Sequence, residues 1–433
     1  MWTRLTLLPM ILLTLAGAQE RQPQQDTSVK DRIRIAREAP REGSTAIPRV
    51  SPLLRDPILE VRIEAVKALV SIGTQHSLDP LIQATSDNDP EVQIRATDGL
   101  VNFYVPGYVQ GGISGSLRRA GNIVSAPFRK GPNTDVIEPT VQVRPEIIEA
   151  IGRLASGGSS MTARANAARA VGVLRGRAAL PHLYEALRSK DDQVMYEALI
   201  AIQKIADPAS GDRVIFLIRD LTERIQVAAI ETAGILLAKE AAPELRRVVE
   251  TTSKKNVRRA ALDALARLTL PENRDLIARY LNDGDPALRA AALYGLARMR
   301  SSADLPVMER AFNEERKMEA RLAGAYGMVL LGSKASGEFG PLEYLVNTLN
   351  QRAWKQVAAS YLEELARQPE TRQRLLPVLA MGTRAEKLEL APVLSRTCGR
   401  ECMDTLDRMA KDPDPEVARE GVRAGAVLRA RLN

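Results

Sequence analysis

The sequence predicts an all-α fold, an α-solenoid of about twelve helix hairpins, and three observations support this prediction. One short pattern returns every 29 to 32 residues, prolines return in a second register, and aromatic residues make up only 4% of the chain. Repetition on this length scale is typical of arrays in which each unit packs only against its neighbours.

The repeated pattern consists of an apolar anchor, often an arginine, then small residues and a leucine. Its clearest copy runs from Asn256 to Leu268, and the next copy runs from Ala287 to Ala297. The apolar residues of a copy recur at helical spacing, so each copy predicts the first helix of a hairpin. The anchors in this frame are Val29, Val61, Val92, Ala163, Val194, Ile225, Val257, Leu288, Met318, Val357, Leu388 and Val417.

Prolines indicate where the second helix of each hairpin begins. Proline is tolerated in the first turn of a helix, because its missing N–H would have no partner there. Asp-Pro pairs such as Asp89-Pro90 lead into first helices, which the aspartate can cap. The second-helix prolines lie 18 to 20 residues after the anchors at Pro48, Pro80, Pro181, Pro243, Pro306 and Pro377, with Pro145 and Pro341 next to two longer gaps.

These residues resemble the HEAT-like repeat first named from phycobilisome lyases, with its Val-Arg-x-x-Ala-Ala-x-Ala-Leu core. The resemblance covers residues 29–433 apart from the insertions, and it implies a solenoid whose second helices line a concave face that holds the partner. The arginine after the anchor is absent at Met195, Gln226 and Ala418, so no continuous row of arginines is expected.

The N-terminus has the three-part layout of a secretory signal peptide. Arg4 precedes an apolar run from Leu5 to Leu15, and Ala16-Gly17-Ala18 matches the small-x-small cleavage pattern. Residues 1–18 are therefore predicted to be a signal peptide and residues 19–28 a polar linker. An uncleaved N-terminal anchor is the alternative. The mature protein is expected to be exported, in the periplasm or outside the cell.

A glycine-rich insertion, residues 105–144, interrupts one hairpin between the helix after Pro90 and the helix that begins at Pro145. Long insertions in compact arrays are usually functional or disordered. The alternatives are a mobile surface loop and a flap that contacts a partner or an anionic membrane surface. The candidate accessory contact residues are Ile113, Leu117, Arg118, Arg119 and Val124, where the apolar members share one helical face with Ala120.

The residue types that catalysis or metal binding requires are scarce. The two histidines, His76 and His182, fall in different repeats, and no His, Cys or carboxylate cluster is visible, so no catalytic, cofactor-binding or metal site is predicted. Cys398 and Cys402 lie at a turn and predict a disulfide, with a buried thiol pair and a redox-active pair as alternatives. The net charge of +8 favours acidic partners, whereas no nucleic-acid module is recognisable.

The predicted function is that of a non-enzymatic protein-interaction scaffold in the periplasm or cell envelope, which binds its partner on the concave face. The candidate basic centre of that face consists of second-helix arginines, which could instead pair with Glu244, Glu250 and Asp275 and simply keep the surface solvated. Two other functions stay open, a lyase- or chaperone-like enzyme that acts on a bound cofactor, and a membrane-surface adaptor. The candidate partner-binding residues are Arg246, Arg247, Arg274 and Arg279.

Overall fold

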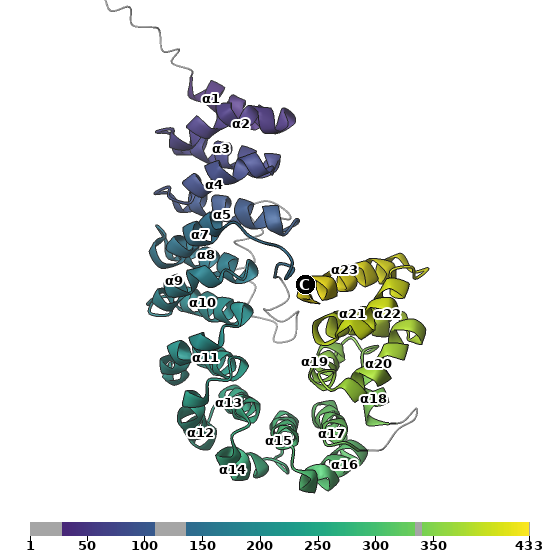
Figure 1. Cartoon of the computed structure of the whole chain (residues 1–433). Coiled ribbons are helices and arrows are strands. Elements are labelled where there is room, and N and C mark those ends of the chain that lie inside the picture. The colour runs from purple at the N-terminus through teal and green to yellow at the C-terminus, as the bar shows by residue number, and fades with distance from the viewer. Residues whose placement is uncertain (1–27, 109–135, 334–339, 433) are drawn as a thin grey trace, which may run out of the picture.

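The computed structural model describes residues 28–108, 136–333 and 340–432, and these residues form helices and connecting turns without a strand. The helices stack as successive hairpins into a curved solenoid with two arms joined by a bend (Figure 1). This arrangement confirms the predicted all-α solenoid. Among the described residues, each helix is too short or too polar to cross a membrane.

Each predicted anchor falls in or at the start of one first helix. Most anchors are fully buried, as Val61 and Val257 are, but Val29 is 38% exposed, and Val357 is 37% exposed while its neighbour Ala358 is 0% exposed. The frame therefore shifts by one residue in that unit. The first helices are α1 (Val29–Glu38), α3 (Leu59–Ile72), α5 (Pro90–Tyr104), α8 (Met161–Val173), α10 (Asp192–Ile205), α11 (Glu223–Ile235), α13 (Lys255–Leu268), α15 (Pro286–Arg298), α17 (Met318–Leu330), α19 (Lys355–Leu365), α21 (Arg384–Thr397) and α23 (Pro415–Leu432).

The second helices are shorter and mostly start at or next to a predicted proline. Pro377 is the exception, because it lies inside α20, which begins at Pro369. One second helix, η7, is 3-10 rather than α-helical. The second helices are α2 (Ile47–Val50), α4 (Leu78–Ala84), α7 (Pro145–Gly157), α9 (Leu180–Ala186), η7 (Pro208–Arg219), α12 (Ala242–Thr251), α14 (Arg274–Ala278), α16 (Leu305–Glu314), α18 (Pro341–Thr348), α20 (Pro369–Met381) and α22 (Met403–Met409).

The two layers lie on opposite sides of the curve, and the first helices are on the inside. In Figure 1 the helices α8, α10, α11, α13, α15, α17, α19, α21 and α23 border the concave side, whereas α9, α12, α14, α16 and α22 lie on the outside. The expectation that second helices line the concave face is therefore wrong. In this chain the second helices form the convex layer.

Small residues in the first helices explain this direction of curvature. A Cβ added to Gly172 of α8 would lie 2.7 Å from the Cα of Ala201 in α10, and one added to Gly234 of α11 would lie 2.9 Å from the Cα of Ala264 in α13. Neighbouring first helices thus approach almost backbone to backbone. The layer with the closer spacing becomes the inner layer of the arc.

Many first helices end on a residue in the left-handed region. This residue closes the last turn, as Leu237 does when its N–H donates to the carbonyl of Gly234 and the next N–H donates to Ala233. Glycine is the usual residue in this position, because a side chain there is strained. The positive-φ residues after first helices are Gly73, Arg175, Ala206, Leu237, Thr269, Arg300 and Gly332.

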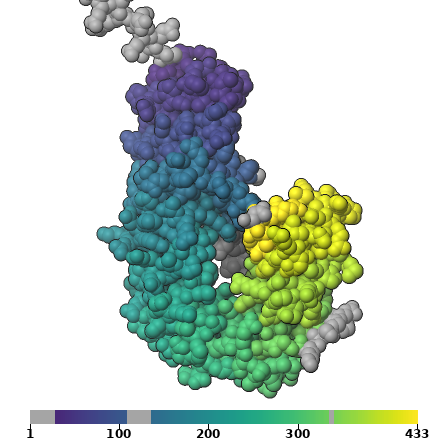
Figure 2. All heavy atoms as spheres, in the orientation of Figure 1, coloured from purple at the N-terminus to yellow at the C-terminus, as the bar shows by residue number. Residues whose placement is uncertain are grey.

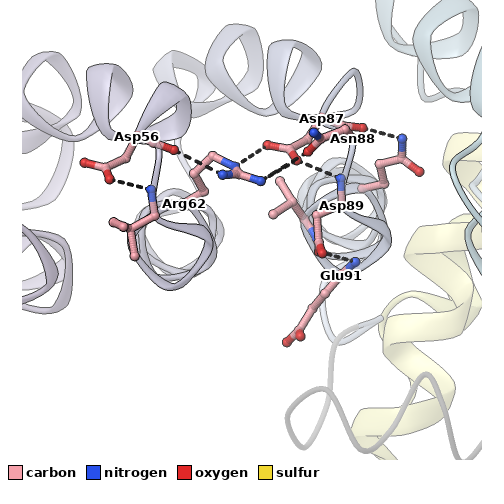
Figure 3. A network of polar contacts seen from close by, with 9 residues as sticks. Asp56, Arg62, Asp87, Asn88, Asp89 and Glu91 are labelled. Carbon is pink, nitrogen blue, oxygen red and sulfur yellow. Dashed lines mark hydrogen bonds and ion pairs between the residues drawn. The ribbon is translucent and has the colours of Figure 1, made fainter. Parts of the chain in front are cut away.

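The arginine after the anchor joins successive inter-repeat linkers (Figure 3). Arg62 donates to the carbonyl of Asp56 in the preceding linker at 3.1 Å and pairs with the carboxylate of Asp87 in the following linker at 2.8 Å. Asp89 then caps α5 by accepting from the N–H of Glu91 at 2.8 Å. The recurrent arginine of the motif is therefore structural in this unit, and Arg289 occupies the same role between the Asp283 carbonyl and Glu315.

The two arms of the arc approach each other on the inner side. Figure 2 shows the C-terminal arm beside the N-terminal arm, and an ion pair between Arg423 of α23 and Glu138 joins them at 2.8 Å. Glu138 belongs to the described end of the insertion, residues 136–144. That end therefore folds toward the inner face instead of projecting from the edge where hairpin loops emerge.

Candidate functional site: the inner face of the bend

Three tyrosines from three first helices meet on the inner side of the bend. Tyr294 of α15, Tyr326 of α17 and Tyr361 of α19 form a cluster in which the rings of Tyr326 and Tyr361 stack with centroids 4.7 Å apart. The ring of Tyr294 lies 5.3 Å from Tyr326 and 5.8 Å from Tyr361. Because α15 and α19 belong to units two steps apart, their contact is a direct consequence of tight inward bending.

A charged network surrounds this tyrosine cluster. Glu364 of α19 accepts a hydrogen bond from the hydroxyl of Tyr294 at 3.0 Å and pairs with Arg298 of α15 at 2.9 Å. Arg298 also donates to the backbone carbonyl of Arg267 at 3.0 Å, and Arg267 pairs with Asp263 at 2.7 Å. The network therefore links α13, α15 and α19, and it fixes the bend through both apolar and charged contacts.

Burial sets the protonation states of the tyrosine cluster. Desolvation raises the pKa of Tyr294 to about 12 and also raises the pKa values of Tyr326 and Tyr361. The neighbouring Asp263 carboxylate raises the pKa of the Arg267 guanidinium. At neutral pH the three tyrosines are therefore uncharged, and Arg267 is a permanent cation.

Glu231 of α11 is the group on these helices whose proton is exchanged near neutral pH. Desolvation, with repulsion from Asp263, raises its pKa to about 7, although the residue itself is exposed. Glu231 reaches water from a crowded surface, so the charge of its carboxylate is partly screened. The pKa shift therefore corresponds to only a small change in the free energy of unfolding. Near neutral pH, a small fall in pH removes one negative charge here.

This arrangement suits the recognition of a protein partner. We call it the bend cluster, and it consists of Glu231, Asp263, Arg267, Tyr294, Arg298, Tyr326, Tyr361 and Glu364. Arg267 and Asp263 are accessible, with side chains 39% and 43% exposed, and they rest on a buried aromatic base. Tyrosine and arginine are the residue types that dominate the energy of protein interfaces. The cluster offers a rigid aromatic platform with charges of both signs at its rim.

The arginines predicted to form the binding centre lie on α12 and α14, in the outer layer. Arg274 forms a two-point ion pair with Asp304 at 2.6 Å, Arg247 lies 3.5 Å from Glu244, and Arg279 lies 4.0 Å from Glu250. Three of the four arginines thus face carboxylates; Glu244 and Glu250 are the expected partners of the solvated-surface alternative, whereas Arg274 pairs with Asp304 instead of Asp275. Their predicted location on the concave face is wrong, and their role in binding, including that of Arg246, stays a prediction.

Two other sets of predicted residues lie outside the described residues. These are the signal peptide, residues 1–18, and the accessory contact residues Ile113, Leu117, Arg118, Arg119 and Val124. Residues 334–339, in the longer gap that precedes Pro341, also lie outside the described residues.

The structure joins Cys398 and Cys402 in a disulfide at the turn that precedes α22. Glu401 lies close enough for its carboxylate to complete a three-ligand group with the two sulfurs, which all lie within 4.8 Å. Metal coordination by cysteine requires a reduced, deprotonated thiolate, and the two sulfurs are bonded to each other in the disulfide, while Glu401 accepts from Arg372 at 3.1 Å. The oxidised pair is thus a structural link within one turn.

One histidine in the outer layer makes polar contacts that the sequence pattern does not reveal. His182 of α9 lies with Nδ1 3.1 Å from Oγ of Ser156 and with Nε2 3.6 Å from the carboxylate of Glu149, both on α7. Serine, histidine and glutamate in this order resemble a nucleophile with its base. The hydroxyl of Ser156, however, also donates to the carbonyl of Arg153 at 3.3 Å, as a helical serine does when it has a structural role.

The family comparison finds HEAT repeats in two stretches of the chain, residues 23–101 and 251–328. No curated protein sequence matches this chain significantly.

Among solved structures, the chain is similar to one from the complex of CpcE and CpcF of phycocyanin lyase from Nostoc sp. PCC7120. The identity is 19% over 60% of this chain and 90% of that chain, with a TM-score of 0.36. It is also similar to importin beta, at 12% identity over 89% of this chain and 57% of that one, with a TM-score of 0.39. The match over residues 23–101 and 251–328 confirms the resemblance to HEAT repeats that was drawn from the sequence.

Proposed function

We propose that this chain is an exported, non-enzymatic scaffold that binds a protein partner on the inner face formed by its first helices. The bend cluster is the observation that supports this proposal most strongly. Accessible Arg267 lies over the ring of Tyr294 at 5.7 Å and pairs with accessible Asp263, on helices that border the concave side of the bend (Figure 1). A preorganised aromatic platform loses little conformational entropy on binding, which favours affinity.

Charge supports a partner with an acidic surface. The chain carries 61 Lys and Arg residues against 53 Asp and Glu residues, a net charge of +8. Because many of these charges pair within the solenoid, the excess acts mainly through the long-range field, which accelerates association with an acidic partner. Binding should therefore weaken as the salt concentration rises.

Site-specific photo-cross-linking in the native cell envelope tests the binding face. The cross-linking amino acid p-benzoylphenylalanine replaces Glu231 or Arg267 on the inner layer, and Arg246 or Arg279 on the outer layer serves as the matched position. We expect discrete adducts from the inner positions and none from the outer positions. Adducts from the outer positions alone would contradict the proposed face.

Export is tested separately by N-terminal sequencing of the protein recovered from the envelope. Cleavage after Ala18 predicts a mature chain that begins at Gln19. Recovery of Met1 in a membrane-bound protein would instead support the uncleaved anchor.

A further inference from the structure

A short extended stretch of the insertion lies on the inner face and contacts both arms. The N–H of Ile137 donates to the carbonyl of Val173 at the end of α8 at 2.9 Å, and the Ile137 side chain is only 7% exposed. The next residue, Glu138, accepts from Nε of Arg423 on α23 at 2.8 Å. One backbone group, one apolar side chain and one carboxylate are thus held within two residues.

The residues that follow Glu138 explain why this contact spans only two residues. Pro139 follows Glu138, and the N–H of Val141 donates to the carbonyl of Glu138 at 3.0 Å, which closes a turn with proline in its favoured position. Beyond the turn, Arg144 pairs with Asp79 at 2.7 Å and leads into α7. The contact is therefore made by an extended dipeptide held between a turn and the rest of the chain.

The charge on the C-terminal arm fits a carboxylate. Arg423 also pairs with Glu420 of its own helix at 2.7 Å. Burial raises the pKa of Glu420, and the carboxylates of Glu138 and Glu389 raise it further. The side chains of Arg423 and Glu138 are 46% and 41% exposed, so the guanidinium binds the carboxylate by a charge-assisted contact that water partly screens.

We propose that the Val173 carbonyl and the Arg423 guanidinium form a peptide seat, the α8–α23 seat, for an extended segment with an apolar residue followed by an acidic one. This inference rests on the proposed function and names the partner class of the inner face. Ile137 and Glu138 occupy the seat within the same chain, and a partner segment of the same pattern competes with them. Because Ile137 and Glu138 already occupy the seat in part of the molecules, the apparent affinity for the partner equals the intrinsic affinity multiplied by the fraction of seats that are empty.

A peptide binding experiment tests the α8–α23 seat directly. The probe is a fluorescein-labelled octapeptide with the sequence of residues 136–143, Val-Ile-Glu-Pro-Thr-Val-Gln-Val. The full chain binds it weakly, because the tethered copy is present at an effective concentration of about 1 mM. The variant I137D/E138R empties the seat and should bind the probe about fivefold more tightly, the size of effect that an exposed ion pair supports. The further change R423E should abolish that gain.

Matched controls separate recognition from general effects. A probe with Gln in place of Glu should lose the gain, and E185R, at an exposed glutamate of the outer helix α9, should bind the probe as the unaltered chain does. An emptied variant that binds no more tightly, or that ignores R423E, would overturn the inference. If cross-linked adducts still form at position 231 while the peptide assay fails, only the α8–α23 seat is eliminated. If the peptide assay succeeds while no adduct forms at position 231, only the proposed function is eliminated.

A distance measurement keeps the test independent of how well one variant folds. Spin labels at exposed Thr162 on α8 and exposed Ala430 on α23 report the separation of the arms. The E138R variant should broaden the distance distribution, and the charge swap E138R/R423E should restore it. An unchanged distribution in E138R would show that the contact does not hold the arms, and would also overturn the inference.

Discussion

Replacing Tyr294 with phenylalanine removes one hydroxyl group from the bend cluster and leaves the aromatic packing intact. That hydroxyl donates to Glu364 at 3.0 Å and accepts from Arg298 at 3.2 Å. Hydrogen bonds to charged groups contribute about 1.5–3 kcal/mol to stability. Glu364 keeps Arg298 at 2.9 Å, and its side chain is 24% exposed, so water can replace part of the loss. We therefore expect the free energy of unfolding to fall by about 1.5–2 kcal/mol.

Urea unfolding combined with hydrogen exchange in α19 measures this change. The matched control is Y280F, because the hydroxyl of Tyr280 donates to the neutral carbonyl of Val249 at the longer distance of 3.4 Å. The control should cost about 0.5 kcal/mol. A double-mutant cycle with E364Q should show a coupling energy of about 1 kcal/mol. If Y294F costs no more than Y280F, or if Y294F and E364Q are additive, the network does not brace the bend.

Three further predictions follow from the same structure. L237G should stabilise the protein by about 0.5–1 kcal/mol in thermal unfolding, because the left-handed backbone strains leucine there; a loss of stability would contradict the strain. G234A should cost about 1–3 kcal/mol, since its Cβ would lie 2.9 Å from Ala264, whereas G284A, with open space, should cost far less; equal costs would contradict close helix contact. Glu231 has a folded-state pKa near 7, above its unfolded value, so its contribution to stability is complete below pH 4.5 and is lost as pH rises through 7. E231Q should remove up to about 1 kcal/mol of this pH dependence of stability in thermal melts from pH 5 to 8. An identical pH profile for E231Q and the unaltered chain would refute the shift.

The repeat architecture could be predicted because it is written locally in each unit. The anchor, the small residues and the proline at the start of the second helix lie within one hairpin, so periodicity alone located α7 after a long insertion at Pro145. The predicted anchors are exposed in the first unit, at Val29, and in one C-terminal unit. In one C-terminal unit the buried anchor is Ala358 instead of Val357, and Pro377 is tolerated inside α20.

The direction of curvature could not be predicted in the same way. It depends on which layer has the closer spacing, and that spacing comes from contacts between units, such as Gly172 against Ala201. The expectation that second helices face inward came from the family resemblance, and the small residues of the first helices reverse it here. Glycines inside several first helices, such as Gly172 of α8 and Gly234 of α11, were the available indication.

The bend cluster and the α8–α23 seat were beyond the reach of sequence reasoning for a related reason. Tyr294 and Glu364 are separated by 70 residues and Glu138 and Arg423 by 285, so neither pair falls in adjacent repeats. Periodicity relates a residue only to its equivalents one unit away. Contacts across the inside of the arc therefore become visible only when the curvature is known.

Carboxylate footprinting of the mature protein with and without its envelope partner tests the central claim most directly. A water-soluble carbodiimide and a small amine modify accessible Asp and Glu side chains, and mass spectrometry quantifies each site. If the partner binds the inner face, it should protect Glu231 and Asp263, while Glu185 of α9 and Glu250 of α12, both exposed on the outer layer, react equally in both states. Protection of Glu185 and Glu250 with unchanged reactivity at Glu231 and Asp263 would contradict the proposed binding face.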